Sequence, residues 1–210
     1  MTLQPIDAVV FDVGGVLLDW DPRHLYRKLF EEERAMERFL AEVCTADWHA
    51  QHDRGVSYER SCAELAATHP ESSEMIWAWA HRTEEMVAGP IEGTVEVVRE
   101  LKQAGVPRYL LTNMETVTWP QRVERFPFLR WFDGAIVSSF EGLAKPDPAI
   151  FELLLERFHL TAPRTLFIDD SEANLDTARS LGLETLHFRS PGQLRQRLTD
   201  AGLLASGPAG

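Results

Sequence analysis

The chain has 210 residues and contains 21 Lys and Arg against 33 Asp and Glu, a formal net charge of −12 at pH 7. So large an acidic excess argues against a nucleic-acid-binding protein, which would carry a basic face, and against binding to an anionic membrane surface. Hydrophobic residues make up 44% and charged residues 26% of the chain. That balance is typical of a folded globular protein with one domain, or one domain with an insertion.

The chain has two cysteines, Cys44 and Cys62, too few for a disulfide framework or a four-thiolate zinc site. The first six residues contain no Lys or Arg, so they do not match a signal peptide. No apolar run approaches the roughly 18 residues that a membrane span needs. We therefore expect a cytoplasmic protein without a disulfide bond.

The first predicted strand is the short apolar run at residues 8–11, which ends at Asp12. Similar runs follow at residues 108–112, 134–137, 165–168 and 184–187. Helical patterns lie between them, and several begin at Asp-Pro or end at Gly, as helix termini often do. Continuous apolar strands that alternate with helices predict a doubly wound, Rossmann-like α/β fold with a parallel sheet covered on both faces.

The spacing of the strands predicts an inserted helical subdomain. The first strand ends near residue 12 and the next begins near residue 107, and a crossover helix at 92–104 fills only the end of that gap. Apolar residues at helical spacing form a stripe at Met36, Phe39, Leu40 and Val43. We expect residues 1–16 and 89–210 to form the core and residues 17–88 to form a helical cap.

Several residues predict where the cap helices begin and how they pack. The Asp21-Pro22 step is typical of a helix start, and Ser57 and Ser72 are candidate N-caps for two more helices. The cluster of Met75, Trp77 and Trp79 is expected to pack between helices, with a wall of the substrate site as the alternative.

Polar side chains follow four of the predicted strands, at the end of each. They are Asp12 after the first strand, Thr112 and Asn113 after the second, Lys145 after the third, and Asp169 and Asp170 after the fourth. In an open α/β sheet, ligands bind beyond the carboxyl ends of the strands. Each residue alone could be a helix cap or a loop residue, but their joint occurrence in this order predicts one reaction centre.

These residues, in this order, resemble the motifs of the haloacid dehalogenase superfamily. The resemblance covers nearly the whole chain, and the Phe-Asp-x-Gly-Gly-Val opening at residues 11–16 resembles the branch that contains bacterial glucose-1-phosphate phosphatase. It implies a phosphatase in which Asp12 attacks phosphorus and forms an aspartyl-phosphate. It also implies Mg²⁺ held by the Asp12 carboxylate, the Gly14 carbonyl and Asp170, with Asp169 bound directly or through water.

The same resemblance assigns the substrate contacts. Thr112 and Asn113 would donate hydrogen bonds to the phosphoryl oxygens, and the backbone at Gly14 and Gly15 would border the phosphate. Lys145 would neutralise the charge of the phosphate and of the nucleophile, which otherwise repel each other.

One position departs from the pattern of most phosphatases of the superfamily. They carry a general acid and base two residues after the nucleophile, where this chain has Gly14. The substrate could have a leaving group that needs little protonation, Asp19 or Asp21 could supply the proton, or the protein could be slow or inactive. We expect Asp19 and Asp21 to cap the first cap helix instead.

A second polar cluster lies in the predicted cap. His49, His52 and Asp53 have a spacing compatible with a metal site, but no further ligand is evident, and a polar helix face is the preferred interpretation. The Asp53-Arg54-Gly55 step resembles a cap turn of the same branch. Arg54 is expected in a surface ion pair, with contact to substrate as the alternative.

The sequence thus predicts a Mg²⁺-dependent phosphomonoester hydrolase that acts on a small phosphorylated metabolite, for which a sugar phosphate is one candidate. One alternative is a 2-haloacid dehalogenase that uses the same Asp12, but those enzymes lack an acidic pair like Asp169 and Asp170. Another is a catalytically degenerate binding module, favoured by Gly14 and disfavoured by the intact Asp12 and Lys145. The sequence leaves the oligomeric state open.

Overall fold

The structure is a computed structural model and describes residues 5–205. The first residues, on which the expectation of no signal peptide rests, lie partly outside this range. The strands are β1 Ala8–Phe11, β2 Leu18–Trp20, β3 Val87–Pro90, β4 Arg108–Thr112, β5 Gly134–Val137, β6 Thr165–Asp169 and β7 Glu184–His187. The α-helices of the first half are α1 Arg23–Tyr26, α2 Glu33–Glu42, α3 Ala46–Ala50, α4 Tyr58–Thr68, α5 Ser73–His81 and α6 Glu92–Gln103. Those of the second half are α7 Thr118–Arg125, α8 Ser138–Glu141, α9 Pro148–Arg157, α10 Glu172–Ser180 and α11 Pro191–Asp200. Short 3₁₀ segments are η1 His52–Arg54, η2 Pro70–Ser72, η3 Thr83–Met86, η4 Pro127–Trp131 and η5 Ala162–Arg164.

Five strands form one sheet in the order β5-β4-β1-β6-β7, and every neighbouring pair is parallel. All five strands predicted from the apolar runs are confirmed, and β6 extends one residue further, to Asp169. The order reverses at β1, because β4 lies on one side of it and β6 on the other. The doubly wound α/β fold predicted from the sequence is therefore confirmed.

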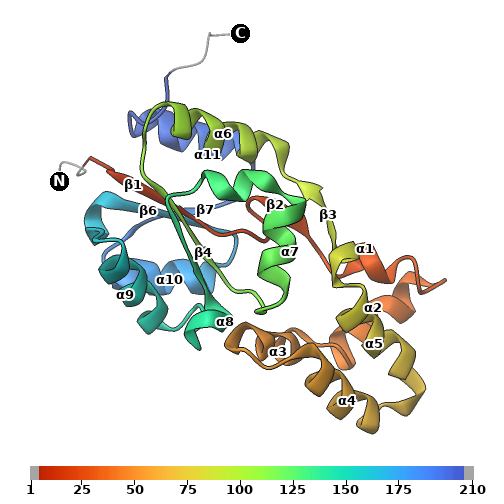
Figure 1. Ribbon diagram of the computed structural model, residues 1–210. Helices are drawn as coiled ribbons and strands as arrows, with labels where there is room; N and C mark the ends of the chain where they lie inside the picture. The colour runs from red at the N-terminus through yellow and green to blue at the C-terminus, as the bar shows by residue number, and fades with distance from the viewer. Residues whose placement is uncertain (1–4, 206–210) are drawn as a thin grey trace.

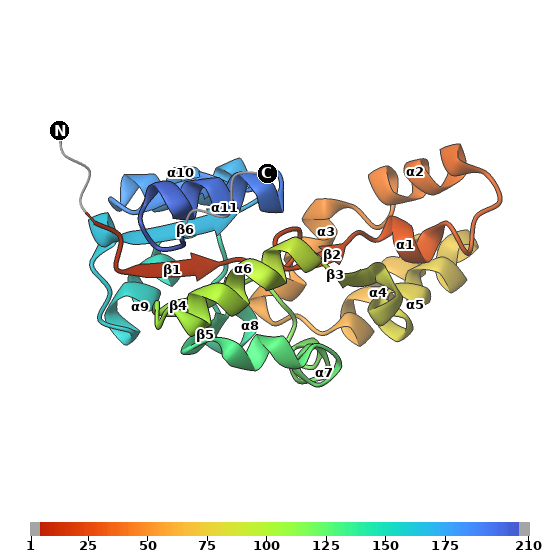
Figure 2. The ribbon, with the colours of Figure 1, turned by 90° about the horizontal axis from the view of Figure 1, so that it is seen from above.

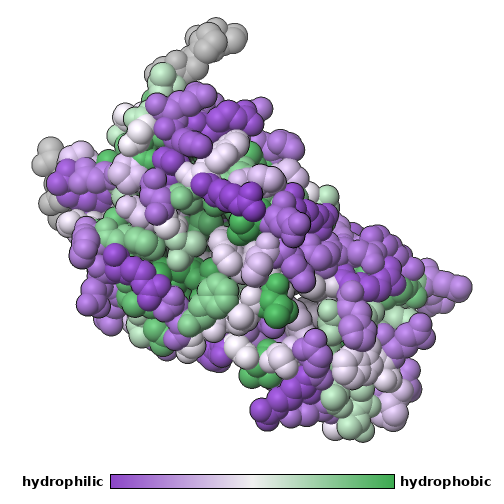
Figure 3. Space-filling model, in the orientation of Figure 1, coloured by the Kyte–Doolittle hydropathy of each residue, from purple (hydrophilic) through white to green (hydrophobic). Residues whose placement is uncertain are grey.

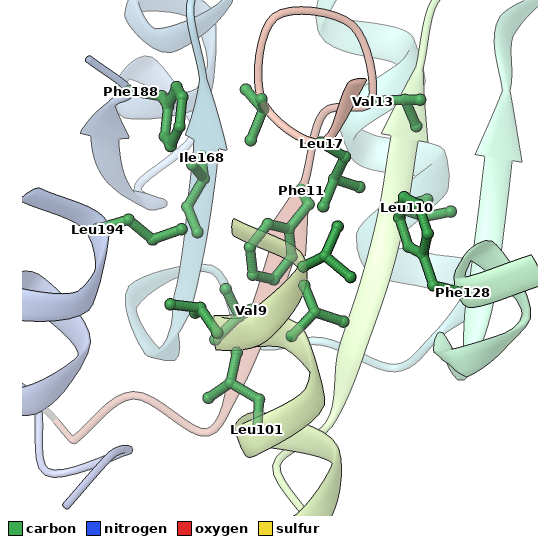
Figure 4. Packing of buried hydrophobic residues seen from close by; sticks show 14 of the residues in the cluster. Val9, Phe11, Val13, Leu17, Leu101, Leu110, Phe128, Ile168, Phe188 and Leu194 are labelled. Carbon is green, nitrogen blue, oxygen red and sulfur yellow. The ribbon is translucent and has the colours of Figure 1, made fainter. Parts of the chain in front are cut away.

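Alternate residues of the central strand β1 face opposite sides of the sheet, as the pleat requires. Val9 and Phe11 pack into a cluster with Leu101 of α6 and Leu194 of α11. Figure 4 shows this layer, with the Phe11 ring between the sheet and the α6 helix. Val10 packs on the other side.

The second layer of the core covers the opposite face of the sheet. Val10 and Phe167 contact a cluster that contains Phe151 of α9 and Leu175 of α10. The Phe151 and Phe167 rings meet edge to face with centroids 5.3 Å apart. In Figure 1, α6 and α11 accordingly lie on one side of the sheet, and α9 and α10 on the other.

Helices α1–α5 form a separate lobe beyond the carboxyl end of the sheet (Figure 2). This lobe has its own hydrophobic cluster, in which Tyr26, Met36, Ile76 and Trp79 are buried. The cluster supports our proposed division into a core of residues 1–16 and 89–210 and a cap of residues 17–88.

The two chain crossings between the lobes are strands rather than helices. Segments β2 and β3 pair antiparallel, with Leu18 opposite Pro90 and Asp19 opposite Gly89. The sequence predicts only helices in this region, so the strand pair is a correction to that prediction. The pairing satisfies backbone groups where the chain leaves the core and where it returns.

The N-cap predictions for the cap helices have mixed outcomes. The Ser57 hydroxyl accepts a hydrogen bond from the Arg60 N–H and caps α4, as predicted. Ser72 occupies the N-cap position of α5, but its side chain makes no capping hydrogen bond.

The exterior of the helical lobe is mostly polar (Figure 3), and both cysteines lie inside the protein. Figure 3 shows hydrophilic residues over most of the helical lobe on the face drawn. No helix within residues 5–205 has both the length and the apolar character that crossing a bilayer requires. Cys44 and Cys62 are buried free thiols.

Replacing Phe151 by Ala tests the packing of the core. Phe151 is fully buried, so Phe151→Ala should lower the free energy of unfolding by about 3–5 kcal/mol. The matched control is Phe140→Ala, because Phe140 is 53% exposed and its truncation should change stability by less than about 0.5 kcal/mol. Equal effects in urea denaturation would contradict the packing described.

Candidate active site

The carboxylate of Asp12 lies at the carboxyl end of the central strand. Asp12 directly follows β1, and its N–H donates to the Ile168 carbonyl of the neighbouring strand (2.9 Å). Its Oδ1 accepts from the Val13 N–H (2.7 Å) and lies 2.9 Å from Lys145 Nζ. The side chain is thus held in place at one oxygen, while the structure gives Oδ2 no hydrogen-bond partner within residues 5–205.

Lys145 is the buried cation of the site. Its side chain is 1% exposed, and Nζ lies 2.6 Å from Asp169 Oδ2 as well as beside Asp12. Burial by itself lowers the pKa of Lys145, but the two carboxylates outweigh it and raise the pKa above its ordinary value. The ammonium is therefore charged at neutral pH.

Asn113 fixes the loop that carries Lys145. Its Oδ1 accepts from the Lys145 N–H (2.9 Å), and its Nδ2 donates to the Lys145 carbonyl (3.0 Å). These two bonds join the segment after β4 to the segment before α9. Asn113 therefore positions the lysine in addition to bordering the cavity.

The two members of the acidic pair, Asp169 and Asp170, lie in different environments. Asp169 is fully buried and accepts from Lys145, from Asn174 and from the Ser171 N–H. Asp170 is exposed toward the cavity, and within residues 5–205 its carboxylate accepts no hydrogen bond, although its backbone carbonyl pairs with His187 Nε2 (3.0 Å). Asp169 thus acts as a buried acceptor, and Asp170 keeps its oxygens available for a ligand.

Gly15 makes room for Asp170. Its φ is +68°, in the left-handed region, and a Cβ at this position would collide with Asp170 Oδ2. The neighbouring Gly14 carbonyl accepts no backbone hydrogen bond within the described residues. Both glycines line the cavity.

The donor set fits a magnesium ion. Ligand oxygens of Asp12, Asp169 and Asp170 all lie within 4.8 Å of one another. Burial raises the pKa values of Asp12 and Asp170, although Lys145 lowers both. Three carboxylates against one ammonium leave an excess of two formal negative charges within a small space, and hard oxygen donors are the ligands that Mg²⁺ prefers.

A cavity of about 580 Å³ opens above this cluster, between the core and the cap. Six of the predicted site residues line it, namely Asp12, Gly14, Gly15, Asn113, Lys145 and Asp170. Thr112 and Asp169 do not border the cavity and are buried beside it, with 1% and 0% exposure. The Thr112 hydroxyl donates to the Asn113 carbonyl at 3.5 Å.

The predicted polar face around His49 and His52 is wrong. His52 is fully buried, where Nε2 pairs with the Ser61 hydroxyl (2.6 Å) and Nδ1 with the His49 carbonyl (2.8 Å). His49 stacks on Trp20 with ring centroids 5.3 Å apart and lines the cavity. Burial lowers both pKa values to about 4, so both rings are neutral at pH 7.

Two other cap predictions need correction. Asp21 accepts from the Arg23 N–H (2.8 Å) at the start of α1 as predicted, but Asp19 lies in β2 and pairs with His24 instead of capping. Arg54 is exposed and forms no ion pair within residues 5–205, so the predicted surface ion pair is also wrong.

Several residues that line the cavity, from both lobes, were not predicted from the sequence. The cap supplies Trp20, Asp53, Tyr58 and Thr83, and the core supplies Glu115, Thr118 and Arg122. Asp53 was singled out only as part of a metal-like spacing or a turn. Nothing in the local pattern of the others distinguishes them from packing residues, and only the fold brings them together.

Comparisons with known proteins agree with this geometry. The family described as haloacid dehalogenase-like hydrolase matches residues 6–182. A sesquiterpene phosphatase from Aspergillus oryzae is 27% identical over 193 residues, which cover 86% of this chain and 89% of the relative. A phosphorylated carbohydrates phosphatase from Thermotoga maritima is 26% identical over 188 residues, covering 87% and 84%.

Solved structures show the same fold. A HAD-family enzyme from Bacteroides thetaiotaomicron in complex with magnesium superposes with a TM-score of 0.68 at 20% identity, covering 89% of this chain and 95% of that one. A dehalogenase with an intermediate complex gives 0.68 at 17% identity, covering 89% and 86%. The finer resemblance to the glucose-1-phosphate phosphatase branch stays a prediction. The chain belongs to the haloacid dehalogenase-like hydrolase family and is an enzyme related to phosphatases.

Proposed function

We propose that the protein is a Mg²⁺-dependent phosphomonoester hydrolase that acts on a small phosphorylated metabolite through an aspartyl-phosphate on Asp12. The observation that carries the proposal is the convergence of Asp12, Asp169 and Asp170 around one point beside the buried Lys145. A reaction at carbon, as in a 2-haloacid dehalogenase, gives no role to Asp170, which faces the cavity unpaired. A degenerate binding module would not need Lys145 buried between two carboxylates, an arrangement that is costly to desolvate.

Each group has a defined task in this reaction. Asp12, oriented by the Val13 N–H and Lys145, attacks phosphorus, and water later hydrolyses the acyl phosphate. The Lys145 ammonium lowers the repulsion between the anionic nucleophile and the anionic phosphate. Thr112, through a small shift of its hydroxyl, donates to a phosphoryl oxygen. Asn113 donates to one through its backbone N–H, because its side-chain amide is engaged by Lys145 and Asp53.

The residues that would hold Mg²⁺ are Asp12, Asp170 and the Gly14 carbonyl. Bound there, the ion would neutralise charge on the phosphate and on the carboxylates as a Lewis acid. Asp169 is assigned a positioning role, because Lys145, Asn174 and the Ser171 N–H already engage both of its oxygens.

The outer part of the cavity suggests a polar leaving group. Arg122 is 2% exposed, and its guanidinium donates to Glu84 (3.0 Å) and makes no other hydrogen bond within residues 5–205. Tyr58 and Thr83 line the same region. Buried groups with free hydrogen-bonding capacity favour a hydroxylated molecule such as a sugar phosphate, because an apolar group would leave them unpaired.

The first test measures phosphate release from sugar phosphates, farnesyl phosphate and 4-nitrophenyl phosphate with Mg²⁺ and with EDTA. We expect Mg²⁺-dependent release that falls by at least about 10³-fold in Asp12→Asn, since the amide cannot act as the nucleophile. The control Asp7→Asn alters an exposed carboxylate paired with Arg164 and should leave the rate unchanged. Near-normal activity of a folded Asp12→Asn variant would remove Asp12 from the mechanism. Chloride release from 2-chloropropionate, without phosphate release, would favour the dehalogenase.

A second prediction separates the two members of the acidic pair. Asp170→Asn should weaken Mg²⁺ binding, measured by calorimetry, by at least about 10-fold, because it removes a charged ligand. Asp176→Asn is the control, since Asp176 is exposed on α10 and pairs with Arg179. Unchanged Mg²⁺ affinity in Asp170→Asn would exclude Asp170 as a ligand.

A third prediction concerns the leaving group. Tyr58→Phe removes one hydroxyl from the cavity and should lower kcat/KM for the preferred sugar phosphate by roughly 3–10-fold, with little change for 4-nitrophenyl phosphate. Tyr109→Phe is the matched control, because Tyr109 packs on Phe158 in the core. Equal losses with both substrates would place Tyr58 outside the leaving-group site.

A further inference from the structure

A turn of the cap brings the carboxyl group of Asp53 to the cavity, beside Asn113. Asp53 belongs to η1, which Gly55 ends with a φ of +93°. This turn packs on α8 of the core, where the Cβ of a larger residue at position 55 would contact the Ser139 carbonyl at 3.6 Å. Asp53 thereby reaches Asn113 of the core, whose Nδ2 donates to Asp53 Oδ2 at 3.3 Å.

Asn113 connects Asp53 to the reaction centre. The same Nδ2 donates to the Lys145 carbonyl, and Oδ1 accepts from the Lys145 N–H. Asp53 also lies close enough to the Lys145 ammonium to feel its charge, and it lines the cavity together with Asp12. Asp53 of the cap therefore lies beside the core residues that would hold the phosphate.

The chemistry of the site lacks a proton donor at the usual place. Position 14 is glycine, which has no side chain to protonate the departing oxygen. Without such help the rate for a poor leaving group falls by about 10²–10⁴-fold.

The other acidic residues of the cavity already have hydrogen-bond partners or belong to the metal-binding cluster. They are Asp12 and Asp170 in the metal-binding cluster, Asp19 paired with His24, Asp21 at the start of α1, and Glu115, which accepts three hydrogen bonds from the start of α7. Asp53 accepts only from the Asn113 amide within residues 5–205. His49 also lines the cavity but is neutral, since burial lowers its pKa to about 4.

The environment of Asp53 suits a group that carries a proton near neutral pH. Burial raises the pKa of Asp53 to about 6, although the Asn113 hydrogen bond and the positive charges of Lys145 and Arg54 lower it. Tyr58 of α4 also faces this carboxyl. Glu141 of α8 is paired with Arg157. A phosphate dianion in the cavity would raise the pKa of Asp53 further.

We propose that Asp53, delivered by the cap, is the general acid and base of the reaction and replaces the carboxylate that is missing at Gly14. This inference rests on the proposed phosphatase function. Asp12 forms a bond to phosphorus while the bond from phosphorus to the leaving oxygen breaks, and that oxygen takes its electron pair and the proton of Asp53. The Asp53 carboxylate then takes a proton from water, whose oxygen bonds to phosphorus. The bond from phosphorus to Asp12 breaks, which returns the free carboxylate and releases inorganic phosphate.

The proposal predicts a dependence on the leaving group. A primary alkyl phosphate such as glycerol 3-phosphate needs protonation of its leaving oxygen, whereas the nitrophenolate of 4-nitrophenyl phosphate leaves without it. In single-turnover phosphorylation with Mg²⁺, Asp53→Asn should therefore slow the alkyl substrate by about 10²–10⁴-fold and 4-nitrophenyl phosphate by less than about 10-fold. Because the base is also absent, the phosphoenzyme formed from 4-nitrophenyl phosphate should accumulate. Asp47→Asn is the control, since Asp47 is exposed on α3.

The wild-type protein offers a test that does not depend on the folding of a variant. An acid must be protonated, so phosphorylation by the alkyl phosphate should slow as the pH rises above the pKa of Asp53, while phosphorylation by 4-nitrophenyl phosphate should not. Asp53→Asn should lack this alkaline decline. Equal losses with both substrates, or a wild-type pH profile that is the same for both, would overturn the proposal. Hydrolysis of neither substrate by the folded wild-type protein would instead contradict the phosphatase function itself.

Discussion

The buried ammonium of Lys145 is the interaction on which the rest of the site depends. It lies 2.9 Å from an Asp12 oxygen and 2.6 Å from an Asp169 oxygen, on a side chain that is 1% exposed. Burying one such charge without a partner costs several kcal/mol, so the three groups stabilise one another only as a set. Asn113 fixes the lysine backbone, and the parallel strands β1, β4 and β6 bring the three segments to one edge of the sheet.

The same charge balance explains why the cluster suits a metal and an anion. One ammonium does not neutralise Asp12, Asp169 and Asp170, and burial raises the pKa values of Asp12 and Asp170. A divalent cation bound there would remove this excess of negative charge, and together with Lys145 it would favour a phosphate in a chain whose overall charge is −12. The cap closes the other side of the cavity, and its Asp53 gives this arrangement a proton donor that belongs to neither the metal-binding cluster nor the glycine loop.

Much of the core could be predicted from the sequence, because its signals are local. Apolar runs mark the five parallel strands, and polar residues such as Asp12 and Asp169 stand where those runs end. The β2–β3 pair could not be predicted, since Leu18 and Pro90 are far apart in the chain and each segment is only three or four residues long. His52 was misjudged because its partner, Ser61, makes a buried position acceptable for an imidazole that would otherwise belong on the surface. The position of Asp53 at the cavity could not be predicted either, because it depends on the packing of the turn at Gly55 against α8.

Covalent chemistry at Asp12 is the most direct test of the proposed reaction. The measurement is mass spectrometry of the protein quenched in acid during turnover of a phosphorylated substrate with Mg²⁺, followed by mapping of the phosphorylated peptide. We predict phosphate on the peptide that contains Asp12, and none when EDTA removes the metal. Phosphate release without any phosphoenzyme at Asp12, or with the phosphate on a different residue, would contradict the account.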